Sequence, residues 1–284
     1  LTESDIMVDS PTNNFCTFNP IAKQPVMLTT LHEGNTKVIC GSINTGRSHP
    51  VGGTIPVTTG KWYFETINEG SSNNGKYHQV GIINTAHKDT MEIFQSPDNP
   101  VVNAVTDDEA WGAWLWNGGQ LEHDNTFDGT YFDGGYTENT SGDITSVAFD
   151  MDAGKIWWGK NGIWLQSGNP ATGASAAYDE GALGFGTVVA VHSSNDGVVL
   201  TANFGQDSSF AGIKTPQGNQ DGNEIGDFYY TPPTGFLALC TSNLPEPAVK
   251  PSEHFNTVHY TGTGAAQSIA VGLQPGLVWV KGKS

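Results

Sequence analysis

The chain has 284 residues, with 29 Asp or Glu against 12 Lys or Arg, which makes the formal net charge −17. A nucleic-acid-binding protein needs a basic surface to displace counterions from phosphates, and this composition provides none. Attraction to an anionic membrane is disfavoured for the same reason, and no apolar stretch is long enough for a membrane helix. The 36 Gly and 15 Pro, spread among short β-like runs, favour a turn-rich, all-β protein.

The first strong elements lie in a domain that we expect to span residues 25–241, after a lead-in over residues 1–24. Residues 61–67 are rich in aromatic side chains and follow a glycine, which predicts a strand, and residues 78–83 predict a second one. Residues 144–150 and 155–159 predict a hairpin. Gly154 lies in its turn, at a position that usually needs a positive φ.

Further hairpins are predicted toward the end of this domain. Asn161–Gly162 is a tight-turn dipeptide, and the runs at residues 187–192 and 198–204 predict two more paired strands. Residues 205–235 are rich in Gly, Asn, Asp and Pro, so we expect a long surface loop or insertion there. A last short strand is expected over residues 236–240. This succession of antiparallel hairpins is typical of a β-sandwich.

The C-terminal part predicts a linker and a second module. Residues 242–253 contain several prolines and read as a stiff linker. From residue 254 to residue 284 the strand pattern restarts, with strands expected over residues 255–260, 267–271 and 277–281. We expect this stretch to be part of a second small β module.

Four segments match one known family in its order. They are Gly60–Glu65, Val80–Ile82, Trp111–Gly112 with the later run at residues 142–162, and the closing strands at residues 189–191 and 202–205. Over residues 25 to 240 the chain therefore resembles the SPRY domain. The resemblance implies an antiparallel, concanavalin-like β-sandwich with no shared catalytic residues and a ligand surface made of variable loops. The family usually has Gly where Thr145 and Ser146 stand, a difference that we expect to affect strand packing.

The segments that flank the SPRY-like region resemble a more specific group of proteins. Residues 9–15, 232–245 and 258–281 are similar to segments of SPRY-containing phage structural proteins. This implies a non-enzymatic virion protein of a tail, fibre or particle surface, assembled in the host cytoplasm. The expected partners are other virion proteins, further copies of the chain in a homo-oligomer, and a host surface glycan or receptor. Neither nucleic acid nor membrane insertion is expected.

Aromatic side chains beside polar loops are the candidate binding residues. Trp114 and Trp116 fall on one face of a strand, and Tyr131 and Tyr136 follow in a stretch rich in Gly and Asp. Such rings can stack on sugars or anchor a protein partner. The competing interpretation, which we favour, is that these aromatics fill the core of the sandwich.

Metal and catalytic motifs are weak. Asp124 and Asp128 occupy calcium-loop positions, but Gly135 stands where the closing Glu should be, so an acidic surface loop is the plainer interpretation. The 8 His and 3 Cys form no zinc-type spacing, and no nucleophile motif is present. We therefore expect no cofactor and no catalytic residues.

Two alternative functions remain open at this point. One is an intracellular SPRY adaptor that binds a short peptide, and the segment after residue 254 argues against it. The other is a carbohydrate-active enzyme on a sandwich scaffold, which needs two carboxylates at a set separation. The absence of a catalytic motif argues against that alternative.

Overall fold

A computed structural model describes residues 10, 12–23, 29–40, 51–70, 79–83, 110–114, 120–123, 126–130, 139–179, 181, 186–190, 198–246 and 250–282. The chain divides into two compact units, Leu1–Asn243 and Leu244–Ser284, and the boundary falls inside the stretch expected as a linker. The first unit is built from two β-sheets, which confirms the all-β fold class.

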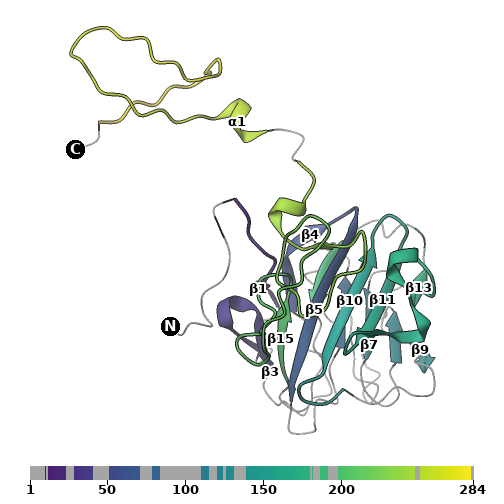
Figure 1. Ribbon diagram of the computed structural model, residues 1–284. Helices are drawn as coiled ribbons and strands as arrows, with labels where there is room; N and C mark the ends of the chain where they lie inside the picture. Colours follow the sequence, from purple (N-terminus) through teal and green to yellow (C-terminus); the bar gives the residue numbers. More distant parts are fainter. Residues whose placement is uncertain are drawn as a thin grey trace. The chain divides into compact units, whose positions relative to one another are not determined.

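One sheet has seven antiparallel strands (Figure 1). In spatial order they are β1 (Phe18–Lys23), β4 (Val51–Val57), β14 (Gly186–Ala190), β6 (Gln79–Ile83), β7 (Ala110–Trp114), β8 (Gln120–His123) and β9 (Thr126–Thr130). Its order differs from the sequence order because β14 inserts between β4 and β6. Strands that are far apart in the chain are therefore neighbours in this sheet.

The other sheet has nine strands. Its main path is β12 (Ile163–Trp164), β11 (Lys155–Lys160), β10 (Ile144–Asp150), β5 (Lys61–Gly70), β15 (Val199–Asn203), β3 (Lys37–Cys40) and β2 (Thr29–His32). β13 (Tyr178–Asp179) pairs with β11, and β16 (Leu237–Ala238) pairs with β5. The β16 pairing is parallel, whereas the other strands of this sheet pair antiparallel.

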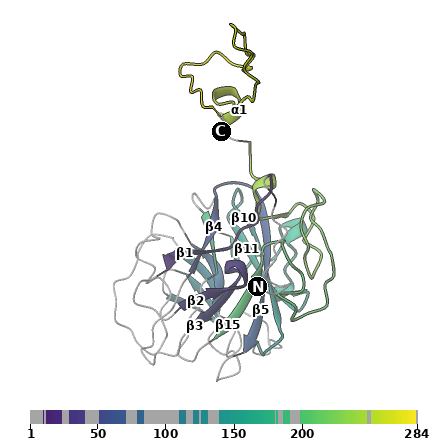
Figure 2. The ribbon, with the colours of Figure 1, turned by 90° about the vertical axis from the view of Figure 1, so that its left-hand side faces the viewer.

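The two sheets pack face to face as a sandwich, which Figure 2 shows after a 90° turn. The indole Nε1 of Trp158 in β11 donates a hydrogen bond of 3.0 Å to the carbonyl of Val80 in β6. The rings of Phe18 in β1 and Phe204 after β15 meet edge to face at 5.8 Å. The predicted antiparallel sandwich is thus confirmed, with an aromatic core between the sheets.

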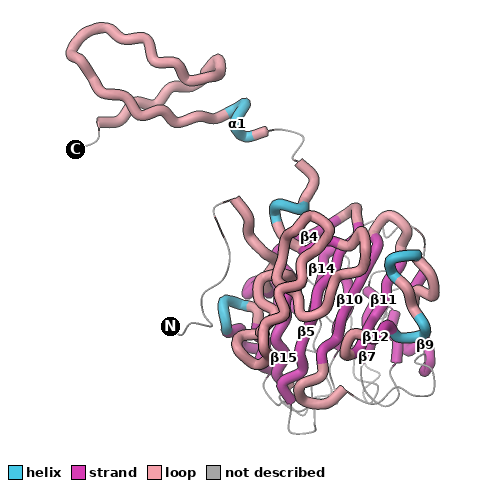
Figure 3. The backbone as a smooth tube through the Cα atoms, viewed as in Figure 1, coloured by secondary structure: helices cyan, strands magenta, loops and turns pink. Residues whose placement is uncertain are grey.

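The outer face of the nine-stranded sheet is also covered. Residues 205–236, here called the covering segment, lie as a long loop over β5, β10 and β15 (Figure 3). Its Phe228 packs on Tyr63 at 5.1 Å between ring centroids, and its Phe236 packs on Trp157 at 5.9 Å. Because both faces of β5 are covered, residues 62–68 are all buried, which explains why this strand shows no polar alternation in the sequence.

The predicted strands and turns of the sandwich are largely confirmed. The 61–67 strand is extended to Gly70, and the 144–150 strand is β10 itself. Gly154 has φ +66° in the turn between β10 and β11. Asn161 and Gly162 have φ +49° and +80°, the pair of positive values that a type I′ hairpin turn requires.

Short helical turns complete the described elements. They are the 3₁₀ turns η2 (Glu33–Asn35), η4 (Leu165–Ser167), η5 (Pro170–Thr172) and η6 (Thr241–Asn243), and the α-helix α1 (Pro251–His254). None of the helices in the described ranges is long and apolar enough to cross a membrane.

The second unit corrects one expectation. After α1, the described residues up to 282 form no strand, so the strands predicted over residues 255–260, 267–271 and 277–281 are not formed. A strand needs a hydrogen-bonded neighbour and a surface on which to bury its apolar face. Here nearly all of these residues are exposed, so strand propensity is present without a partner that could stabilise it.

Candidate functional site

A buried carboxylate lies beneath the covering segment. Glu65 points outward from the middle of β5 and is completely buried. Its carboxylate accepts hydrogen bonds from the Tyr63 hydroxyl (2.8 Å), the backbone N–H groups of Tyr230 (2.7 Å) and Tyr229 (2.9 Å), and the Asn203 amide (3.3 Å). β5, β15 and the covering segment therefore meet at this one side chain.

No Lys, Arg or His among the described residues forms an ion pair with Glu65. Burial removes the carboxylate from water and raises its pKa to about 7, although the hydrogen bonds from Tyr230, Tyr229, Tyr63 and Asn203 act in the opposite direction. Glu65 is therefore poised to change its charge close to neutral pH.

The hydroxyl of Tyr63 links Glu65 to β10. It lies 3.0 Å from the Oγ of Ser146 as well as 2.8 Å from Glu65. Burial and the neighbouring Glu65 charge raise the pKa of Tyr63 well above its ordinary value, so this hydroxyl stays protonated. Ser146 is one of the two residues that stand where the SPRY family usually has Gly, and its side chain here provides a hydrogen-bond partner for a buried tyrosine.

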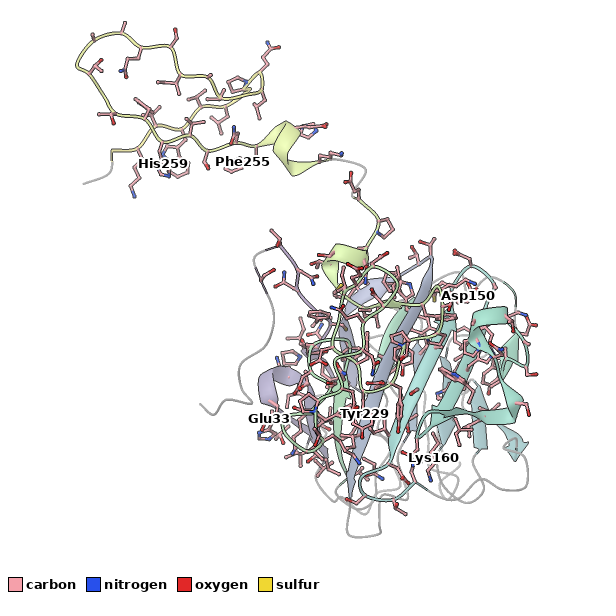
Figure 4. The ribbon with its side chains drawn as sticks, viewed as in Figure 1. Glu33, Asp150, Lys160, Tyr229, Phe255 and His259 are labelled. Atoms are coloured by element: carbon pink, nitrogen blue, oxygen red, sulfur yellow. The ribbon has the colours of Figure 1, made fainter. Side chains whose placement is uncertain are left out.

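A small apolar surface lies beside this buried network. We call Trp164 and Tyr230, two partly exposed aromatic residues beside the β11–β12 turn, the hairpin surface, whereas Ile163, the neighbour of Trp164 in β12, points to the opposite face of the sheet. Ile163 is 72% exposed at the edge strand β12, and Trp164 packs on Tyr63 at 6.4 Å. The Tyr230 ring lies so close to Gly162 that a Cβ there would be 2.9 Å from it. Figure 4 shows Tyr229 on the covering segment, and Lys160 marks the end of β11.

Other acidic side chains of the sandwich hold turns and loops. Asp143 accepts hydrogen bonds from Thr140, Asn161 and Lys160, and Asp150 accepts them from the 152–153 turn and from Lys61. Asp221 accepts hydrogen bonds from the backbone N–H groups of Asn223, Ile225 and Ala238. Asp227 accepts them from Ser208 and Gly218. Burial pushes the pKa of Asp143 upward, but its bonds to Asn161, Thr140 and Lys160 outweigh this and leave the pKa below its ordinary value. These four carboxylates therefore hold turns and loops in place.

Of the four predicted aromatic binding residues, Trp114 alone lies within the residues that the structure describes. Trp114 is the last residue of β7, where it pairs with Gln79 of β6. Trp116, Tyr131 and Tyr136 lie outside the described residues. The neighbouring Trp111 is buried in the sandwich, as the core interpretation of this aromatic run expects.

Asp128 is the described residue of the weak calcium-loop pattern. This residue lies within β9, which pairs with β8, whereas the ligands of a calcium loop must come from a turn that wraps around the ion. Asp124 lies outside the described residues. The described side chains contain no group of three or more His, Cys, Asp and Glu that could hold a metal ion.

Sequence reasoning missed Glu65 and Tyr230 as a pair. One signal was available for Glu65, because its carboxylate directly follows three consecutive aromatic residues, Trp62, Tyr63 and Phe64. Tyr230 carried no comparable signal, since its position above β5 depends on the path of a loop without regular structure.

Comparisons with known proteins give three results. A family model described as a domain of unknown function (DUF7483) matches residues 250–284. No curated protein matches the chain. Among solved structures, the SPRY domain of human HERC1 is similar, with a TM-score of 0.46 and 19% sequence identity, over 65% of this chain and 96% of that one.

Proposed function

We propose that this chain is a non-enzymatic structural protein of a phage virion, placed in a tail, a fibre or the particle surface. It works by binding other virion proteins and further copies of itself, and a host surface glycan or receptor is its second class of ligand. The phage context comes from the sequence resemblance of the segments that flank the sandwich. The binding role is supported by the surface of the second unit.

The observation that best supports this proposal is the apolar character of residues 255–280. Phe255 is 73% exposed, Leu277 87% and Trp279 88%. The same stretch contains no Asp, Glu, Lys or Arg, in a chain with a net charge of −17. Exposed apolar groups on this scale are characteristic of protein–protein contact sites, because water leaves them favourably on association.

The sandwich supports binding rather than catalysis. Among its described carboxylates, Asp143, Asp150, Asp221 and Asp227 are engaged by turns and loops, and Glu65 is closed off beneath the covering segment. The hairpin surface offers partly exposed aromatic groups of the kind that anchor a protein partner or stack on a sugar ring. Binding through such surfaces requires no nucleophile or metal.

The proposal is tested by peptide mass spectrometry on density-purified particles, compared with the soluble fraction of the same lysate. Enrichment of peptides from both units in the particles is expected. Peptides confined to the soluble fraction would contradict the virion assignment and would favour the free adaptor instead. Incubating the purified chain with polysaccharides, with release of reducing ends as the readout, addresses the alternative of a carbohydrate-active enzyme, and turnover there would overturn the non-enzymatic role.

A further inference from the structure

We propose that Glu65, Tyr63 and Ser146 form a proton-controlled latch, in which the charge of Glu65 determines how firmly the covering segment is held on the nine-stranded sheet. This device is independent of the virion assignment. It rests on the geometry of a completely buried carboxylate that receives hydrogen bonds from three different parts of the fold.

The latch spans the boundary between the sheet and the covering segment. Two of the donors to Glu65, the N–H groups of Tyr229 and Tyr230, belong to the covering segment, whereas Tyr63 and Asn203 belong to the sheet. The covering segment cannot leave this part of the sheet without breaking both backbone bonds. Its departure would also let water reach the carboxylate.

Both protonation states of Glu65 can be satisfied while the latch is closed. The ionised carboxylate accepts all four donors. When Glu65 is protonated, its new O–H can donate to the hydroxyl oxygen of Tyr63, and the Tyr63 O–H can donate to Ser146 Oγ, 3.0 Å away. One proton is taken from solvent, and the direction of the bond between Glu65 and Tyr63 reverses. Ser146 is therefore the acceptor that makes the neutral state possible.

The surroundings of Glu65 contain no described cation that would hold its charge. The titratable neighbours are Tyr63 on the same strand and Asp227, Tyr229 and Tyr230 on the covering segment. The neutral polar neighbours are Ser146 on β10 and Asn203 on β15. Asp143 acts electrostatically on Tyr230. Glu69, further along β5, is paired with Lys37 and Thr201. The titratable neighbours are thus acids and phenols.

The direction of the switch follows from this environment. In the closed state the pKa of Glu65 is about 7, and in an opened, hydrated state it returns toward 4.5. Opening is therefore coupled to loss of a proton, so the opening equilibrium rises by up to about tenfold per pH unit between these two values and levels off above them. Integrated over pH 5 to 8, the increase in opening is roughly 70-fold.

Amide hydrogen exchange of the full chain provides the test. Protection factors of the Tyr229 and Tyr230 amides, corrected for the intrinsic pH dependence of exchange, should fall roughly 70-fold from pH 5 to pH 8. The fall should be absent in Glu65→Gln. It should persist in Glu69→Gln, the matched control, which removes a carboxylate from the same strand and the same face. Protection factors whose pH dependence is equal in wild type and Glu65→Gln would overturn the latch.

A second measurement does not depend on the folding of Glu65→Gln. The carboxyl carbon of Glu65 is followed by NMR in the wild-type chain and in Ser146→Ala. We expect titration near neutral pH in the wild type and a shift toward acid in Ser146→Ala, because the neutral state loses its acceptor. Titration of wild-type Glu65 in the ordinary carboxylate range contradicts the latch, and an unmoved titration in Ser146→Ala contradicts the role of Ser146.

Discussion

The hydroxyl of Tyr63 lies 2.8 Å from Oε1 of Glu65, two residues further along the same strand, and both side chains are buried beneath the covering segment. Residues i and i+2 of a strand share a face, so this contact is local in the sequence. The burial is not local, since it depends on Phe228 and its neighbours more than 160 residues later. The covering segment thus makes the polar pair of Tyr63 and Glu65 part of a buried core.

The first prediction concerns the pH dependence of unfolding. The pKa of Glu65 is raised from 4.5 to about 7 in the folded chain, so its contribution to stability is complete below pH 4.5 and is lost as pH rises through 7. The full loss corresponds to about 3 kcal/mol. Urea denaturation at several pH values should show this decline in Glu69→Gln but a flatter curve in Glu65→Gln, and parallel curves would refute the assignment.

The second prediction concerns the covering segment as part of the core. Phe228 is fully buried against Tyr63, and Phe228→Ala should lower the free energy of unfolding by about 3–5 kcal/mol. Ile213→Ala, in the same segment but exposed, should change it by less than about 1 kcal/mol. Similar small effects of both variants in urea denaturation would mean that this segment is not packed as described.

The third prediction concerns the turn that supports the hairpin surface. Gly162→Ala places a side chain at φ +80° and only 2.9 Å from the Tyr230 ring. Gly173→Ala is the matched control, because its φ is +75° and nothing lies within 4 Å of the new Cβ. Both should lose about 1 kcal/mol or more through backbone strain, and Gly162→Ala should lose at least about 1 kcal/mol further through the contact. Equal losses in thermal or urea unfolding would exclude the contact.

The fourth prediction concerns the apolar segment of the second unit. The double substitution Leu277→Ser and Trp279→Ser should weaken self-association by at least about tenfold in Kd, measured by sedimentation equilibrium. Unfolding of the sandwich, followed by circular dichroism, should be unchanged within about 0.5 kcal/mol because both side chains are exposed. Ile21→Ser is the control, since Ile21 is similarly exposed but lies on β1. Unchanged association in the double variant would argue against this segment as the contact.

The sequence predicted the sandwich strands well because their signals are local. Aromatic and β-branched runs, a glycine at a positive φ and an Asn-Gly turn each act over a few residues, and β5, β10 and the turn at Asn161 formed as expected. The strands expected after residue 254 failed because the same local signal needs a pairing strand. The calcium-loop pattern is also a local signal, and the structure places its Asp128 in the strand β9.

By itself, the sequence determined that this acidic chain is an antiparallel β protein with an aromatic core and turns at specific glycines. Only the tertiary structure decided that residues 205–236 would lie over the outer face of the sheet and seal Glu65 beneath Tyr229 and Tyr230. The reason is physical. Turn and strand preferences depend on neighbouring residues, whereas desolvation of a carboxylate depends on which distant segment excludes water from it.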